Sequence, residues 1–169
     1  MPKQVSWLIG VAIVVLGMGG VLFYAQPKDQ DHSQMPAQPS GNSLNISLEP
    51  ANYDFGTISM KDGLVTKSFQ VKNTLDKDFD LSTVYTSCMC TNAKFVLDGE
   101  EYGPFGMQGH GAMKMLNKVL KAGQEAQLLV TFDPNAHGPS GIGVIERSVS
   151  IQSADGDVAS VNIKANVTP

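Results

Sequence analysis

From Ser43 onward the chain alternates apolar and polar side chains with a period of two. Successive side chains of a β-strand point to opposite faces, so this pattern predicts strands that each bury one face. The apolar sets are Leu44, Ile46 and Leu48; Phe69 and Val71; Leu128, Val130 and Phe132; Ile145, Val149 and Ile151; and Val161, Ile163, Ala165 and Val167. Between Leu81 and Val84 the alternation slips by one position, which predicts a β-bulge or a bend within residues 79–88. The sequence therefore predicts an all-β domain, an antiparallel β-sandwich of about seven strands.

One part of this domain lacks the strand pattern. The segment from Asp98 to Gly123 contains six of the 17 glycines, and loops of that length in compact domains are usually functional or disordered. We expect residues 103–111 to lie on the surface or to fold over one edge of the sandwich. Residues 113–119 are predicted to form a short helical turn, because their apolar side chains fall at helical spacing.

The N-terminal region has a different pattern. Residues 5–25 contain no charged side chain, and a helix of that length crosses a hydrocarbon core of about 30 Å. Lys3 precedes this stretch, so the positive-inside rule places the N-terminus in the cytoplasm and the C-terminal domain outside it. The alternative is a cleaved signal peptide, although the apolar core of such a peptide normally has only about 7 to 15 residues.

Composition divides the chain into three parts. Residues 26–42 are rich in proline, glutamine and serine, and a segment of this kind buries too little apolar surface to fold. We therefore expect a transmembrane anchor at residues 1–25, a flexible linker at residues 26–42 and a β-sandwich domain at residues 43–169. The net charge of -4 argues against nucleic-acid binding, which needs a basic face.

Five short motifs follow one another along the predicted sandwich. They are Tyr53-Asp54-Phe55-Gly56-Thr57-Ile58, Phe69-Gln70-Val71-Lys72-Asn73-Thr74, Ser87-Cys88-Met89-Cys90-Thr91, Ala122-Gly123-Gln124-Glu125 and Phe132-Asp133-Pro134. In this order they resemble the bacterial domain-of-unknown-function family 1573 (DUF1573) over nearly all of residues 44–167. The resemblance implies an immunoglobulin-like sandwich in a bacterial protein that is exported or anchored in the inner membrane, and it implies no activity. Met89 stands where many members of the family have glycine.

Cys88 and Cys90 are the only cysteines of the chain. On an extended strand their Cα atoms would lie about 6.5 to 7 Å apart, at the outer limit for a disulfide, so a bridge requires a local kink. An even number of cysteines outside the cytoplasm normally indicates a disulfide. Two free thiolates are instead ligands for a soft metal, Cu(I), or half of a zinc site. The sequence leaves the disulfide, the metal site and a reduced pair open.

Further soft ligands lie elsewhere in the predicted sandwich. Met107, His110 and Met113 fall in the glycine-rich segment, and His137 follows the last of the family motifs. If a soft metal binds, we expect Cys88 and Cys90 to bind it as thiolates together with one or two of these four side chains. The alternative is that the methionines fill hydrophobic gaps under the loop.

Motifs for catalysis are missing from the sequence. It has no phosphate-binding loop and no dinucleotide-binding motif after a strand, and a thiol pair without a local family signature is weak evidence for a nucleophile. We therefore expect a membrane-anchored, extracytoplasmic binding or interaction module without catalytic activity and without a cofactor. Its partner would be an unknown protein or envelope component. The alternative is a copper- or zinc-binding protein, or a thiol-redox protein, that uses Cys88, Met89 and Cys90.

Overall fold

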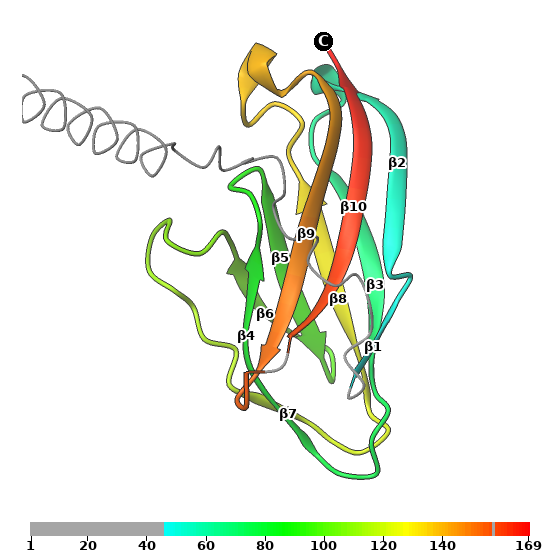
Figure 1. The fold of residues 1–169 in the computed structure, drawn as a ribbon, viewed down its shortest axis with the longest axis vertical. Coiled ribbons are helices and arrows are strands. Elements are labelled where there is room, and N and C mark those ends of the chain that lie inside the picture. Colours follow the sequence, from blue (N-terminus) through cyan, green and yellow to red (C-terminus); the bar gives the residue numbers. More distant parts are fainter. Residues whose placement is uncertain (1–45, 157) are drawn as a thin grey trace, which may run out of the picture. The chain divides into compact units, whose positions relative to one another are not determined.

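Ten strands of the described chain form two five-stranded sheets that pack face to face (Figure 1). The computed structural model describes residues 46–156 and 158–169. One sheet has the order β1-β3-β8-β5-β6, with strands Ile46–Glu49, Val65–Asn73, Glu125–Phe132, Thr91–Leu97 and Glu100–Phe105. The other has the order β2-β10-β9-β4-β7, with strands Asn52–Ser59, Val158–Thr168, Gly143–Ser153, Phe79–Thr86 and Lys118–Leu120. Two short 3-10 helices, η1 (Met60–Asp62) and η2 (Gly138–Gly141), lie between strands.

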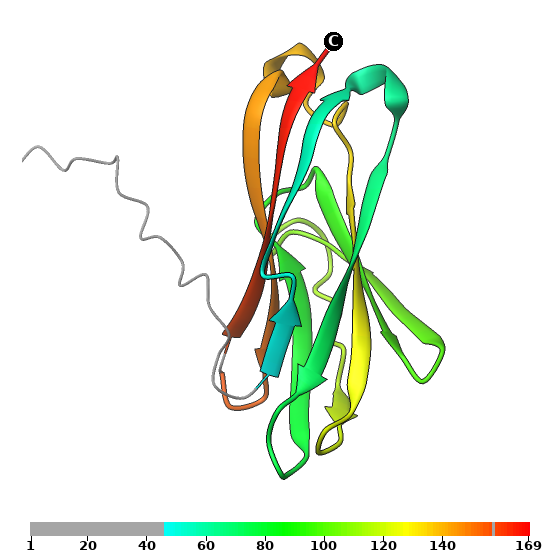
Figure 2. The ribbon, with the colours of Figure 1, turned by 90° about the vertical axis from the view of Figure 1, so that its right-hand side faces the viewer.

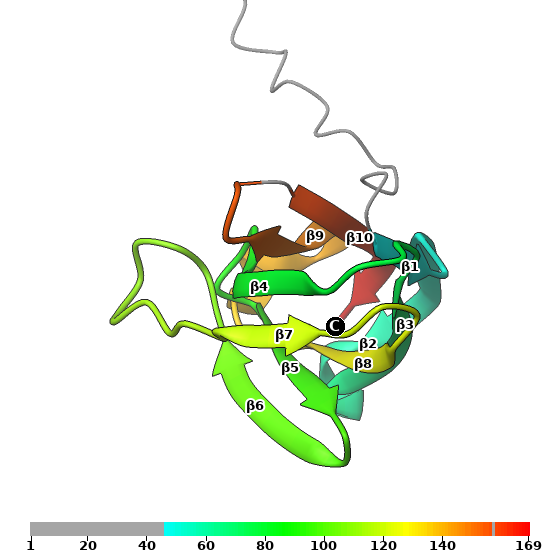
Figure 3. The ribbon, with the colours of Figure 1, turned by 90° about the horizontal axis from the view of Figure 1, so that it is seen from below.

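The core lies between the two sheets, which are seen from the side in Figure 2 and along the strands in Figure 3. Within the described residues, all of the predicted inward-facing side chains are buried: Ile46, Leu48, Phe69, Val71, Leu128, Val130, Phe132, Ile145, Val149, Ile151, Val161, Ile163, Ala165 and Val167. The prediction of an all-β sandwich is therefore confirmed.

The predicted number of about seven strands is too low. Two of the additional strands, β6 and β7, lie within residues 98–123, where the sequence predicts no strands. Each is the last strand at one side of its sheet, and β6 buries only Phe105 while β7 has three residues. An edge strand with little buried surface does not need alternating apolar side chains, so its sequence carries little signal.

One pair of strands is parallel, which corrects the expectation of a purely antiparallel sandwich. β1 pairs with β3 in one sheet, whereas β2 pairs in parallel with β10 in the other sheet. The chain thus changes sheets at Pro50, which lies between β1 and β2. Parallel strands need a long connection, and here the connection is the rest of the domain.

β4 contains the bulge that the sequence predicts. Its register against β9 shifts between Leu81 and Thr83. The carbonyl oxygen of Ser82, inside the bulge, accepts hydrogen bonds from the backbone N–H groups of Leu116 (2.8 Å) and Asn117 (3.2 Å). Residues 113–117 form neither helix nor strand and Lys118–Leu120 form β7, so the helical turn predicted for residues 113–119 is wrong.

The predicted anchor at residues 1–25 and linker at residues 26–42 lie outside the described residues. No helix in the part of the chain that the structure describes has the length and apolar character needed to cross a membrane.

Candidate functional site

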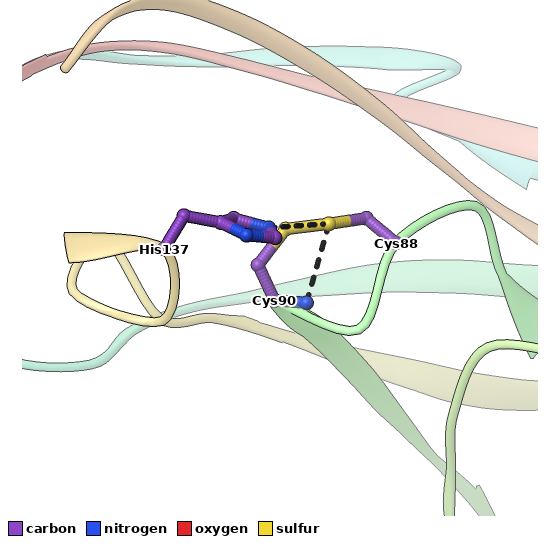
Figure 4. A group of neighbouring side chains, drawn as sticks. All are labelled: Cys88, Cys90 and His137. Carbon is purple, nitrogen blue, oxygen red and sulfur yellow. Dashed lines mark hydrogen bonds between the residues drawn. A yellow bond between two sulfur atoms is a disulfide. The ribbon is translucent and has the colours of Figure 1, made fainter. Parts of the chain in front are cut away.

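Cys88 and Cys90 lie in the tight turn between β4 and β5 and are joined by a disulfide (Figure 4). The turn is closed by the hydroxyl of Thr86, which lies 2.9 Å from the carbonyl oxygen of Cys88 and 3.0 Å from that of Thr91. The backbone N–H of Thr91 also donates to the Cys88 carbonyl oxygen (3.1 Å). The two cysteine Cα atoms are consequently 5.2 Å apart, well within the usual range for a disulfide. The local kink that a bridge requires is therefore built by two threonines.

His137 reaches this disulfide from the loop that follows β8. The Nε2 atom of its exposed ring lies 3.2 Å from Sγ of Cys88 (Figure 4). The loop begins beside the cysteines, because the backbone N–H of Asp133 donates to the carbonyl oxygen of Cys90 (2.9 Å). The Asp133 carboxylate then accepts from the N–H of Asn135 (2.9 Å), a local turn typical of aspartate. This turn folds the chain back and brings the imidazole to the sulfur atoms.

Arg147 on β9 contacts the second sulfur atom. Its Nε–H donates to Sγ of Cys90 (3.4 Å), and its Nη1 donates to the carbonyl oxygen of Glu146 (2.7 Å). β9 is held beside the cysteine turn by two hydrogen bonds between Ser87 and Ser148. One sulfur atom of the disulfide thus contacts an imidazole and the other a guanidinium.

Sequence reasoning missed Arg147, although the alternation along β9 contains a signal for it. Arg147 lies in phase with Ile145 and Val149, both of which are buried. A charged side chain at an inward-facing position of a strand needs a specific partner, because burying an unpaired charge is costly. In the described part of the chain the ion pairs join Lys72 to Glu125 and Lys94 to Glu101, so no carboxylate there neutralises the guanidinium.

The remaining predicted ligands lie in a different place. Met107, His110 and Met113 line a hollow of about 230 Å³ within the long loop, together with Val84 and Tyr85 of β4, and neither cysteine lines it. Of the six predicted site residues, the structure brings together Cys88, Cys90 and His137 and places the other three in this hollow.

Exposure differs along the cysteine turn. The Cys88 side chain retains 8% of its exposure and that of Cys90 2%, whereas Met89 between them is 62% exposed. Both cysteines are therefore buried, and Cys88 is slightly more exposed than Cys90. A guanidinium beside a sulfur atom favours the thiolate over the thiol, so Arg147 is placed to stabilise a negative charge on Cys90.

A known protein family matches the part of the chain that contains the cysteine turn. Residues 46–103 match the family described as "Protein of unknown function (DUF1573)". The DUF1573 resemblance is confirmed for these residues. The match is shorter than the predicted extent to residue 167, so His137 and Arg147 lie outside the DUF1573 segment. No curated protein matches the chain in sequence.

Several solved structures have a similar backbone. A protein of unknown function from Porphyromonas gingivalis W83 is 16% identical, with a TM-score of 0.52 and a match over 79% of this chain and 51% of that chain. The secreted serine protease VesC from Vibrio cholerae is 13% identical, with a TM-score of 0.47, over 75% and 24% of the two chains. The PapD-like domain 7 of human CEP192 is 12% identical, with a TM-score of 0.43, over 80% and 92%. The chain spans about half of the first protein and a quarter of the second, and the first likeness shows a shared fold.

Proposed function

We propose that Cys88 and Cys90 are a reversible dithiol–disulfide pair that exchanges with the thiols of a partner outside the cytoplasm. The observation that carries the proposal is the placement of His137 at one sulfur atom and Arg147 at the other. A disulfide between residues two positions apart closes a very short loop, so it removes little entropy from the unfolded chain. Stabilisation of the fold is therefore a poor explanation for a disulfide that has charged and titratable side chains at both sulfur atoms.

Exchange begins at Cys88, the more exposed of the two cysteines. A partner thiolate attacks Sγ of Cys88, the S–S bond breaks, and its electron pair remains on Cys90 as a thiolate beside Arg147. A second partner thiolate then attacks the partner's own sulfur in the mixed disulfide and releases Cys88. The partner leaves with a new disulfide, and the two protons that its thiols lost end on Cys88 and Cys90. The chain is reduced by two electrons and the partner dithiol is oxidised by two.

The order of attack predicts how single-cysteine variants react. With glutathione disulfide as the probe, Cys90→Ser should accumulate one glutathione on Cys88, because the cysteine that would release it is gone. Cys88→Ser should react more slowly by on the order of tenfold, since accessibility limits thiol reactivity and Cys90 is 2% exposed. Intact-mass spectrometry over time measures both rates.

Two results would contradict the proposal. Faster modification of Cys88→Ser than of Cys90→Ser would reverse the order of attack. If dithiothreitol does not reduce the wild-type pair although circular dichroism shows that the protein is folded, the proposed exchange function is refuted.

The exchange site is presented outside the cytoplasm by a membrane anchor at residues 1–25, through the linker at residues 26–42. The support for this placement is the uncharged stretch of residues 5–25 with Lys3 before it. A disulfide also suits this location, because disulfides persist in oxidising compartments.

A reporter fused after Pro169 tests this location. It should be active outside the cytoplasm and should stay with the membrane fraction after a high-salt wash, whereas a control that lacks residues 1–25 should be soluble. Release of a shortened, soluble fusion would mean that the N-terminal segment is cleaved, and an active cytoplasmic reporter would contradict export.

The sandwich is assigned to the immunoglobulin-like class on the support of the DUF1573 match and the two packed sheets. The prediction of a non-catalytic module that binds a protein or envelope component stays a prediction, because a fold of this kind does not name a partner.

A further inference from the structure

We infer that the reduced form of the cysteine corner binds one Cu(I) ion, with the thiolates of Cys88 and Cys90 and the imidazole of His137 as its three ligands. The inference rests on the proposed function in one respect, since the disulfide must be reducible. To that function the inference adds the binding of one Cu(I) ion, which the dithiol form binds and the disulfide form does not.

The three ligand atoms are already gathered. The two sulfur atoms and a ring nitrogen of His137 all lie within 4.8 Å of one another. Metal–sulfur and metal–nitrogen bonds of about 2.0 to 2.3 Å place the ligands of a three-coordinate ion roughly 3.5 to 4 Å apart. The ring nitrogen is 3.2 Å from Sγ of Cys88, so this pair is close to the required separation.

Only the two sulfur atoms must move apart when the bond between them is reduced. The backbone does not need to rearrange, because the cysteine Cα atoms are 5.2 Å apart and rotation about the Cα–Cβ bonds separates the sulfurs. The contacts of the Thr86 hydroxyl with the carbonyl oxygens of the turn do not involve the sulfur atoms, so reduction of the S–S bond does not remove them directly. Reduction therefore converts the disulfide into a site with little reorganisation.

The chemistry of the ligands selects the ion. Two thiolates and one imidazole are soft or intermediate ligands, and the described cluster contains no carboxylate, which favours Cu(I) over harder cations. Structural zinc sites have four protein ligands, one more than the cluster supplies. Two thiolates, one Cu(I) and the guanidinium of Arg147 also sum to zero charge, so the loaded site needs no further counterion.

The long loop is not required for this site. Met107, His110 and Met113 line a separate hollow that includes neither cysteine. Access comes instead from the solvent side of the turn, where Met89 is 62% exposed and the ring of His137 is exposed. The loop residues therefore provide controls that are chemically matched to the proposed ligands.

A Cu(I) titration of the full-length protein tests the inference. The protein is reduced with dithiothreitol, freed of reductant without oxygen, assayed for thiols and titrated with Cu(I) against a chromogenic Cu(I) chelator. The reduced protein should show two thiols and bind one Cu(I), and the disulfide form should bind none. X-ray absorption at the copper edge should show two sulfur ligands and one nitrogen ligand.

Variants assign the ligands. Cys88→Ser and Cys90→Ser should each lose the tight site, and His137→Asn should weaken it by at least about tenfold, as loss of one of its three ligands implies. The triple variant Met107→Leu, His110→Asn and Met113→Leu should bind one Cu(I) with wild-type affinity. Circular dichroism confirms that each variant is folded before it is titrated.

The outcomes separate the two proposals. Absence of thiols after reduction would overturn the exchange function, and with it this inference. Two thiols without Cu(I) binding would overturn the metal site and leave the exchange function intact. Loss of copper in the loop variant with retention in His137→Asn would place the site in the loop and overturn the assignment to the cysteine corner.

Discussion

Replacing Phe69 with alanine is expected to lower the free energy of unfolding by about 3 to 5 kcal/mol. Phe69 is 0% exposed and lies on β3 opposite Leu128 of β8, inside the sandwich. Removal of the ring forfeits its transfer free energy and leaves a cavity that the two packed sheets close only in part. Chemical denaturation of the full-length protein, followed by circular dichroism, measures the change.

Val144→Ala provides the matched control on the opposite sheet. Val144 is 67% exposed on β9, so its truncation should change the free energy of unfolding by no more than about 0.5 kcal/mol. A loss below about 1 kcal/mol for Phe69→Ala would show that this side chain is not in the core and that the inward face of β3 is misassigned.

The fold could be predicted where a strand buries one face and exposes the other. β3 and β10 follow this rule, with Phe69 and Val71 inward on one and Val161 and Ile163 inward on the other. The rule fails for the edge strands β6 and β7, which bury too little for their sequences to alternate. It also does not reveal pairing between distant strands, so the parallel contact of β2 with β10 had no local signal.

Cys88, Cys90 and His137 could be predicted as site residues, whereas Arg147 and the geometry of the site could not. Cys88 and Cys90 are evident in the sequence, but their separation depends on the hydroxyl of Thr86, which kinks the turn. His137 was one of four candidate ligands, and the turn made by Asp133 decides that it is the one that reaches the sulfur atoms. Cys88 and His137 are 49 positions apart in the sequence, so no local pattern indicates their contact.

Removal of Arg147 should slow opening of the disulfide, because its guanidinium contacts Sγ of Cys90. Arg147→Met takes away the charged hydrogen bond to Cys90, and bonds of that kind contribute about 1.5 to 3 kcal/mol. If most of this interaction acts on the departing thiolate, reduction by dithiothreitol should be about 10- to 100-fold slower, since each 1.4 kcal/mol corresponds to a factor of about ten. Stopped-flow measurement of the rate against dithiothreitol concentration gives the ratio.

Two further variants separate an electrostatic role of Arg147 from a structural one. Arg147→Lys keeps the positive charge and should recover part of the rate, which a purely structural contact would not predict. Lys164→Met removes one positive charge from an exposed position of β10, away from the His137 and Arg147 contacts to the sulfur atoms, and should leave the rate unchanged. Equal rates for wild type and Arg147→Met, with the unfolding free energy unchanged, would show that the guanidinium does not act on the leaving sulfur and that the preference for attack at Cys88 rests on exposure alone.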